Sequence, residues 1–374
     1  MVIAPEIIKR FKRLTSNTTW SFANAGRSET NCVTHGYHRY PAKFIPQIVS
    51  KIIKKYTSDK DLVCDPFGGC GTTLVEAKRL GRISIGFDIN PIAKLITQTK
   101  VTLIKPKTLE KQIKKILLVH ESAPDISFEH HLRISYWFDS DTVLKLDKIY
   151  YAIKNVKNRN VKRFFLCAFS HILKNCSRWL MKSIKPTIDK DKVIPEPIEI
   201  FMQHVHFMAK KNVDYFNELS SSSNLQTRAK MRRCNSSQKL PLESGSVNLI
   251  ITSPPYVTSY EYADLHQLSL HWFNNDEELF KKWPKYSNDF NHFRKKFIGT
   301  IYKKKRNADN LSAIADQIVK KLACINNRLA DNVFSYFTDM KKVFTEMHRI
   351  LKPNGKVCVI IGNTMLKGVE ILNA

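Results

Sequence analysis

A glycine-rich turn between an apolar run and an amphipathic segment constrains the fold of this chain more than any other feature. Residues 61–64 form a short apolar run, the sequence DPFGGCGTT follows at 65–73, and TTLVEAKRL at 72–80 predicts a helix. Residues 83–87 (ISIGF) then predict a second strand that ends at Asp88. Glycines allow a ligand to approach the backbone closely, and the first N–H groups of a helix are free to bind it. The sequence therefore predicts a β-turn-α-β unit with a cofactor-binding loop.

Two phosphate-binding motifs are incomplete in this loop, which narrows the class of ligand. A dinucleotide-binding GxGxxG would need glycine at Leu74, and a phosphate loop would need Gly-Lys-Ser/Thr, which is absent. Asp88 ends the second strand, where carboxylates of doubly wound folds accept hydrogen bonds from ribose hydroxyls. The pattern favours a nucleoside site, and the alternative is a purely structural glycine turn.

Apolar strands and helices alternate further along the chain. Residues 247–252 (VNLIIT) predict a buried strand, and residues 333–351 predict a helix because apolar residues recur at 3.6 spacing. A turn at 352–355 then leads into another buried strand at 356–362 (KVCVIIG). This alternation predicts an α/β fold with a doubly wound, mostly parallel, Rossmann-like sheet.

The central region has a different pattern. From about Ile104 to Leu242 the sequence is mainly helical and carries no recognisable nucleotide motif. We therefore divide the chain into a first half of the α/β domain with the cofactor loop (1–104), a large basic helical insert (105–240) and a second half of the α/β domain (241–374).

Positive charge is concentrated in two windows. The 374 residues include 61 Lys+Arg against 33 Asp+Glu, a formal net charge of +28. Residues 151–190 and 281–306 each contain ten Lys or Arg and one acid, interleaved with aromatic residues. Cations neutralise phosphates and exposed aromatic rings stack on unpaired bases, so a nucleic acid is the expected partner. The alternative is that the aromatic residues are core and the cations a solvated face.

The sequence contains no export or membrane signal. Residues 1–13 lack the uninterrupted apolar stretch and cleavage site of a signal peptide, and no run of about 18 apolar residues occurs. The eight cysteines include no CxxC pair, so we expect reduced thiols and no metal site. A cytoplasmic protein is expected.

Three motifs together resemble one enzyme family. DPFGGCGTT (65–73), GFDINPIA (86–93) and TSPPY (252–256) are similar to motifs of the S-adenosylmethionine-dependent amino-methyltransferases of DNA, and TSPPY resembles the cytosine-N4-specific branch. HRYPAKFIP (38–46) resembles the segment before the glycine loop in some of these enzymes. The resemblance implies a methyltransferase sheet that binds S-adenosylmethionine through Phe44, Asp65, Phe67, Gly69, Gly71, Thr72 and Asp88. Within this set it implies that Asp65 faces the methionine moiety and Asp88 holds the ribose.

The SPPY residues can supply the chemistry of amine methylation. An exocyclic cytosine amine is a poor nucleophile because its lone pair is delocalised into the ring, so hydrogen-bond acceptors must draw its protons as the nitrogen pyramidalises. Ser253 Oγ and the Pro254 carbonyl are the expected acceptors. Pro254 and Pro255 rigidify the loop, and Tyr256 is expected to stack on a base flipped out of duplex DNA.

The motif order resembles the arrangement in which a target-recognition region lies between the cofactor loop and the catalytic loop. Duplex DNA is then the substrate, and a cognate restriction endonuclease is a possible second partner. The basic windows would face this DNA through Lys162, Arg163, Arg178, Arg294, Lys303, Lys304, Lys305 and Arg306.

These motifs lead to a cytosine-N4 DNA methyltransferase of a restriction-modification system as the first hypothesis. Two rivals stay open. One is the same chemistry on adenine N6 in DNA or guanine N2 in transfer RNA, for which Asp or Asn is commoner at position 253. The other is an inactive remnant that binds DNA or cofactor.

The residues after the last predicted strand are few. In the fold that this sequence resembles, a helix and an antiparallel pair of strands follow KVCVIIG, whereas only residues 363–374 remain here. A typical helix and two strands need about 20 residues. We therefore expect the C-terminal strands to be missing and the chain to be a truncated or split product with low activity alone.

Overall fold

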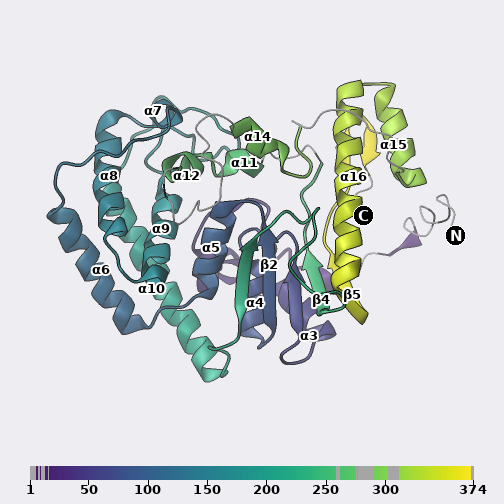
Figure 1. The fold of residues 1–374 in the computed structure, drawn as a ribbon, viewed down its shortest axis with the longest axis horizontal. Coiled ribbons are helices and arrows are strands. Elements are labelled where there is room, and N and C mark those ends of the chain that lie inside the picture. Colours follow the sequence, from purple (N-terminus) through teal and green to yellow (C-terminus); the bar gives the residue numbers. More distant parts are fainter. Residues whose placement is uncertain are drawn as a thin grey trace.

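A five-stranded, fully parallel sheet forms the centre of the computed structural model (Figure 1). The structure describes residues 6, 9, 13–15, 17–257, 262–274, 276, 290–301 and 311–371. The strand order is β3-β2-β1-β4-β5. The strands are β1 (Leu62–Asp65), β2 (Ile83–Asp88), β3 (Ala229–Arg233), β4 (Val247–Thr252) and β5 (Leu351–Val359). The predicted α/β fold with a mostly parallel sheet is confirmed.

The register of the strands brings the predicted motifs to one edge of the sheet. Cys64 of β1 pairs with Ile85 of β2 on one side and with Ile250 of β4 on the other. The strand order therefore reverses at β1, and open parallel sheets bind ligands at the carboxyl ends of the strands next to such a reversal. The glycine loop, Asp88 and the SPPY loop all begin at this edge.

Helices cover both faces of the sheet. Val49 of α3 packs with Val63 and Leu249 on one face, whereas Val333 of α16 belongs to the cluster that contains Ile250 on the other. None of the described helices is long and apolar enough to cross a membrane. The helices outside the insert are η1 (Thr18–Trp20), α2 (Arg27–Thr30), η2 (Val33–Gly36), α3 (Pro46–Tyr56), α4 (Thr72–Arg79), α5 (Pro91–Val101), α11 (Tyr262–Leu265), α12 (Gln267–Trp272), α14 (Phe290–Lys295), α15 (Ala313–Ala323) and α16 (Asn327–Ile350).

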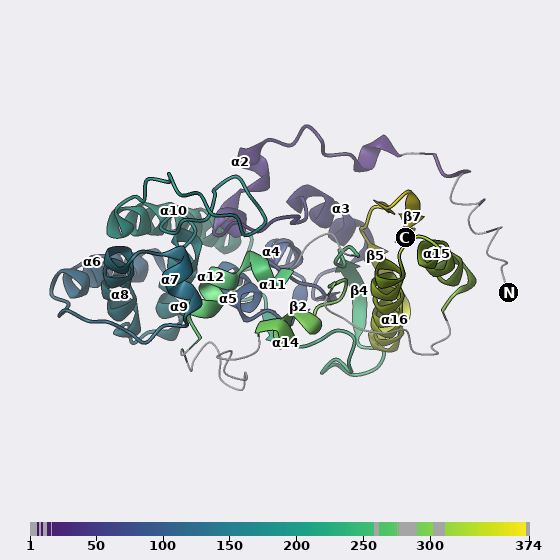
Figure 2. The ribbon, with the colours of Figure 1, turned by 90° about the horizontal axis from the view of Figure 1, so that it is seen from above.

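The helices of the insert lie beyond α5 at one end of the sheet, and α15 and α16 lie at the opposite end (Figures 1 and 2). The insert helices are α6 (Pro106–Glu121), α7 (Arg133–Trp137), α8 (Ser140–Lys154), α9 (Arg159–Ile172) and α10 (Pro197–Ser221). They share one hydrophobic core with α5 and α12. The aromatic residues of the first basic window, Phe164, Phe165, Phe169 and Trp179, are buried in this core. These rings therefore stabilise the insert, and of the two alternatives that the sequence left open for them the structure supports the core role.

The helical insert is shorter than its predicted range of 105–240. Residues 229–233 form β3, which pairs in parallel with β2 and is the edge strand on that side. Met231 is buried beside Gly68 and Gly86, and its backbone N–H donates to Gln98 Oε1 of α5 (3.3 Å). The sequence AKMRR has little strand propensity of its own, so tertiary contacts fix this strand.

The C-terminal part differs from the prediction in two ways. The predicted turn at 352–355 lies inside β5, where the register jumps between the pairs Val247–Leu351 and Leu249–Lys356. β6 (Thr364–Leu366) and β7 (Val369–Ile371) then form an antiparallel pair that is separate from the main sheet. The expectation that the C-terminal strands are missing is therefore corrected in part: two strands of three residues each are present, but among the described residues no helix follows β5 and neither strand joins the main sheet.

Candidate active site

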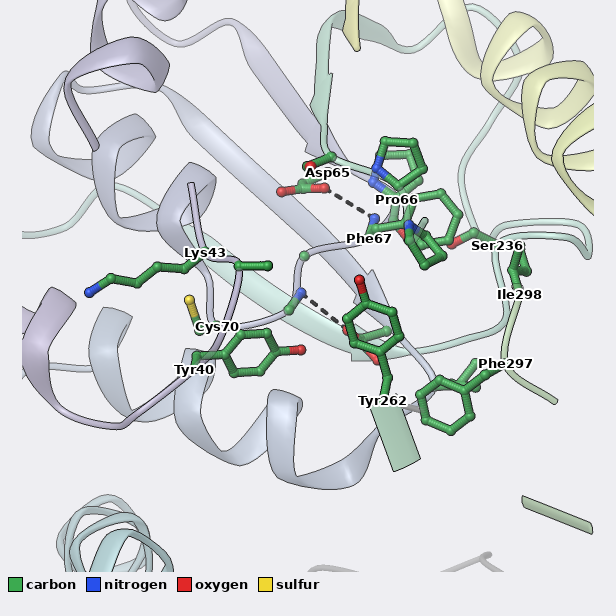
Figure 3. Close-up of a pocket in the computed structure, with 18 of the residues that line it drawn as sticks. Tyr40, Lys43, Asp65, Pro66, Phe67, Cys70, Ser236, Tyr262, Phe297 and Ile298 are labelled. Carbon is green, nitrogen blue, oxygen red and sulfur yellow. Dashed lines mark hydrogen bonds between the residues drawn. The ribbon is translucent and has the colours of Figure 1, made fainter. Parts of the chain in front are cut away.

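A pocket opens at the carboxyl edge of β1, β2, β3 and β4, where the predicted motifs meet (Figure 3). Its wall combines segments that are far apart in the sequence. The lining residues fall in 40–44, 65–70, 88–89, 234–236, 253–256 and 296–298, together with Thr72 and Tyr262. Of the seven residues predicted for the cofactor, all but Gly71 line this pocket, and so do all four SPPY residues.

Asp65 holds the glycine loop to the ends of two strands. Its Oδ1 accepts from the Phe67 N–H (3.0 Å) and the Thr252 hydroxyl (2.8 Å), and its Oδ2 accepts from the Thr73 hydroxyl (2.7 Å). Burial raises the pKa of Asp65 to about 6, although these three donors oppose the rise. The carboxylate therefore links β1, the start of α4 and the end of β4 at the floor of the pocket.

Asp88 combines a fixed orientation with access to the pocket. Its Oδ2 accepts from the Gly69 N–H (3.1 Å) and its Oδ1 from the Asn90 N–H (2.8 Å). Burial raises the pKa of Asp88 to about 6 against these donors, and the nearby charge of Asp65 raises it further. An ionised carboxylate has about four acceptor sites, so Asp88 keeps capacity for donors of a ligand.

The glycine loop depends on two glycines in the left-handed region. Gly69 has φ 45° and Gly71 has φ 80°. A Cβ at Gly71 would lie 2.5 Å from Thr97 Cγ2 of α5, so no other residue fits there. Gly71 is buried and precedes α4 as its N-cap, which corrects the expectation that it lines the cofactor site.

The side chains of α5 hold the same loop from behind. The Thr97 hydroxyl donates to the Gly69 carbonyl (2.8 Å), and the buried Lys100 ammonium donates to the Cys70 carbonyl (2.9 Å). The loop backbone is therefore fixed from the side that faces away from the pocket.

The segment before the glycine loop supplies one aromatic wall. Tyr40 and Phe44 line the pocket, and a Cβ at Gly69 would lie 3.2 Å from the Tyr40 hydroxyl. The Lys43 side chain extends away from the pocket (Figure 3), and its ammonium donates to Asn31 Oδ1 (2.5 Å). The wall is therefore aromatic, without the Lys43 charge.

The SPPY loop is held in place by two glycines from later in the chain. Ser253, Pro255 and Tyr256 are half-buried, and the Tyr256 hydroxyl accepts from the Gly362 N–H (3.1 Å). Gly299 has φ 80°, and a Cβ there would lie 2.6 Å from the Tyr256 carbonyl oxygen. The segment that contains Gly299 therefore packs directly against the SPPY loop.

Several pocket residues were missed by the sequence-based prediction. Cys234, Asn235 and Ser236 follow β3 and line the pocket, and Ser236 Oγ donates to the Pro66 carbonyl (2.5 Å). Phe297 and Ile298, which belong to the basic window 281–306 that was expected to face DNA, line the pocket near Ser236 (Figure 3). No motif marks residues 234–236; only their position after β3 would have indicated them, and that strand was not predicted.

The predicted DNA contacts are spread over several surfaces. Lys162 and Arg163 are half-buried on α9, and Arg178 is exposed. Arg294 is ion-paired with Asp264 (2.6 Å). Four of the predicted residues, Lys303, Lys304, Lys305 and Arg306, lie outside the described residues.

Comparison with known proteins shows similarity to DNA methylases. Residues 9–99 match the family model of the N6_N4_Mtase DNA methylases. Over 98% of its length, the chain is 26% identical to Type II methyltransferase M.MvaI of Kocuria varians, covering 84% of that protein. Residues 9–99 therefore carry the sequence pattern of these DNA methylases, and the chain is similar to a Type II methyltransferase over nearly all of its length.

Other relatives cover different shares of the chain. Type II methyltransferase M.MjaII of Methanocaldococcus jannaschii is 31% identical over 50% of this chain and 30% of that protein. Type II methyltransferase M.BsoBI of Geobacillus stearothermophilus is 20% identical over 91% of this chain and 76% of that protein.

The pocket fits S-adenosylmethionine, the methyl donor that Type II DNA methyltransferases use. The donor carries ribose hydroxyls, an apolar methionine stem and a planar base. Asp88 offers free acceptor capacity at the end of β2, and Tyr40, Phe44 and Phe67 offer apolar surface in the same pocket. The residue types present therefore match the groups that the donor presents.

Proposed function

We propose that this DNA methyltransferase methylates the N4 amine of cytosine in duplex DNA, as the modification enzyme of a restriction-modification pair. The observation that carries the proposal is the position of Ser253, directly before Pro254-Pro255-Tyr256, in the pocket that Asp88 and the glycine loop also line. The names of the relatives, Type II methyltransferases, support the restriction-modification part.

Asp88 and the glycine loop form the cofactor half of the site. When bound, S-adenosylmethionine supplies a methyl group on a positively charged sulfur. Asp88 accepts hydrogen bonds from the ribose, and the backbone at Phe67 and Gly69 lines the cofactor. Phe44 packs at the methionine end.

Ser253 and Pro254 activate the amine in the catalytic half. With the donor bound, the amine nitrogen would take the methyl group as the S–C bond breaks, and the proton that the amine gives up would pass to solvent, because neither Ser253 Oγ nor the Pro254 carbonyl is basic enough to keep it. Ser253 Oγ and the Pro254 carbonyl accept the amine N–H groups, which draws electron density onto the nitrogen and turns its lone pair out of the ring plane. Because an exocyclic cytosine amine lies inside the duplex, the base must first be flipped out of the stack.

Tyr256 serves as the stacking surface for the flipped base. Its hydroxyl is fixed by the Gly362 N–H and its backbone by the close approach of Gly299, so the ring has little freedom to turn. A fixed aromatic ring stacks on a base at a small entropic cost.

The proposal is tested by nucleoside mass spectrometry of duplex DNA after incubation with the purified chain and S-adenosylmethionine. We expect N4-methylcytosine. N6-methyladenine alone, methylguanine in transfer RNA, or donor binding without transfer would each overturn the proposal. Ser253→Ala should lower turnover and leave donor binding unchanged, whereas Ser222→Ala, at an exposed site after α10, should change neither.

A further inference from the structure

A second groove of the molecule runs along β3 and carries only positive charge. Among the described residues that line it there are nine Lys or Arg and no Asp or Glu. The walls come from β2, β3, α5 and the first turns of α9. Arg233 lines this groove, and the next residue, Cys234, lines the active-site pocket. The groove therefore starts where the pocket ends.

The cations of this groove are close enough to act on one another. The Lys94 side chain is exposed, but partial desolvation by the groove walls lowers its pKa, and the charges of Arg233, Arg163, Arg159 and Lys230 lower it further. These residues come from α5, α9 and β3, so the fold itself gathers them. Like charges held together destabilise the free protein, and an anion between them removes this repulsion.

We propose that this groove binds the sugar-phosphate backbone of the duplex that flanks the methylated base. The inference rests on the proposed function, because the same DNA must place a base in the adjoining pocket. β3 has five residues and spans about 17 Å at about 3.3 Å per residue. Phosphates of one strand of a duplex recur about every 3.4 Å along the axis while they wind around it, so the groove lies along about five base pairs and contacts the phosphates that face it.

The lining of the groove favours a duplex over a single strand. Proteins that bind single-stranded nucleic acid use aromatic rings as stacking surfaces for unpaired bases. Phe216 is the one aromatic residue among the described residues that line the groove. A row of cations without such rings contacts phosphates and makes no contact with the bases. The groove therefore adds affinity for DNA and orients it, but gives no sequence preference.

A triple variant tests the proposal with little risk to the fold. Lys94, Arg159 and Lys230 are exposed, so Lys94→Gln, Arg159→Gln and Lys230→Gln together remove three charges without opening the core. The matched control replaces three exposed lysines outside this groove and the active-site pocket: Lys111→Gln, Lys115→Gln and Lys321→Gln.

The readout is the salt dependence of binding to a duplex of about 30 base pairs. Each lost phosphate contact lowers the slope of log K against log salt by about 0.9, so we expect the groove variant to lose about 2 to 3 and the control to keep the wild-type slope. On a duplex that ends at the target base, the groove variant and the control should have the same slope. Equal slopes on the long duplex, or lost affinity for transfer RNA with DNA binding unchanged, would overturn the proposal.

Two further measurements separate this inference from the proposed function. Calorimetric titration with S-adenosylmethionine should give wild-type affinity for both variants, which shows that the fold is intact. Product analysis reports the methylated base independently of the slope. A slope change with N6-methyladenine as product would support DNA binding by the groove and overturn cytosine specificity. An unchanged slope with N4-methylcytosine as product would support cytosine specificity and overturn DNA binding by the groove.

Discussion

Replacement of Asp65 by asparagine should change how the stability of the protein depends on pH. The Asp65 side chain is 2% exposed and accepts from Phe67, Thr73 and Thr252. In Asp65→Asn the amide oxygen still accepts from the Phe67 N–H and the Thr252 hydroxyl. The Thr73 hydroxyl turns to accept from the amide nitrogen. The substitution therefore preserves the contacts and removes the buried charge.

The size of the effect follows from the pKa of Asp65, which burial raises from 3.8 to about 6. Well below pH 4 the carboxyl is protonated in the folded and unfolded states and contributes no pH dependence. Between pH 4 and 6 the unfolded state ionises first, so the stability of the wild type falls as the pH rises. One pKa unit corresponds to about 1.4 kcal/mol, so this carboxylate lowers the free energy of unfolding by about 3 kcal/mol above pH 6.

Urea unfolding of both proteins between pH 4 and 7.5 measures this difference. The free energy of unfolding of Asp65→Asn relative to the wild type should rise by about 2.4 kcal/mol from pH 4 to pH 7, because part of the unfolded-state titration lies below pH 4. Glu243→Gln, at an exposed carboxylate, is the control and should show no such rise. If the free energies of unfolding of Asp65→Asn and the wild type differ by the same amount across this pH range, then Asp65 is not a buried carboxylate whose ionisation destabilises the fold.

Three other substitutions test separate parts of the site. Asp88→Ala should weaken S-adenosylmethionine binding at least about tenfold in calorimetry, since hydrogen bonds to charged groups contribute about 1.5 to 3 kcal/mol, and leave DNA affinity unchanged; the converse pattern would place Asp88 outside the cofactor site. Tyr256→Ala should lower binding of the flipped base by about 1 to 3 kcal/mol, whereas Tyr256→Phe should lose only the Gly362 hydrogen bond, and wild-type turnover of the alanine variant would remove this ring from the site. Gly299→Ala should reduce turnover because its Cβ would lie 2.6 Å from the Tyr256 carbonyl oxygen. The control is Gly245→Ala, where φ is also positive (62°) but the new Cβ would have no atom within 4 Å, so this variant introduces backbone strain without a steric clash and should leave turnover unchanged.

The parts of the site that follow strong local signals could be predicted from the sequence. β1, β2 and β4 are apolar runs, and the residues after them carry glycine, carboxylate and Pro-Pro patterns. Because parallel strands bring their carboxyl ends to one edge, these patterns converge on one pocket. Asp65, Asp88 and Ser253 follow these strands and line the pocket together with Phe44, which only the resemblance of residues 38–46 to a known family indicated.

The parts that depend on tertiary contacts could not be predicted. β3 is fixed by the packing of Met231 and by Gln98, so the pocket residues after it, Cys234 to Ser236, had no local signal. The aromatic residues of the first basic window match both a buried helix and a stacking surface. Their burial depends on how α9 packs against α5 and α12, which is not encoded within the window itself.

Helix α5 connects the two surfaces that the proposals assign to cofactor and DNA. Toward the pocket, Thr97 and Lys100 hold the carbonyls of the glycine loop. Toward the insert, the Thr99 hydroxyl donates to the Arg163 carbonyl (3.3 Å) on α9, and Lys94 lies in the basic groove beside Arg163. One rigid helix of eleven residues therefore sets both the shape of the loop and the position of the cations. This arrangement fixes the distance between cofactor and DNA backbone, which a transfer between two bound molecules requires.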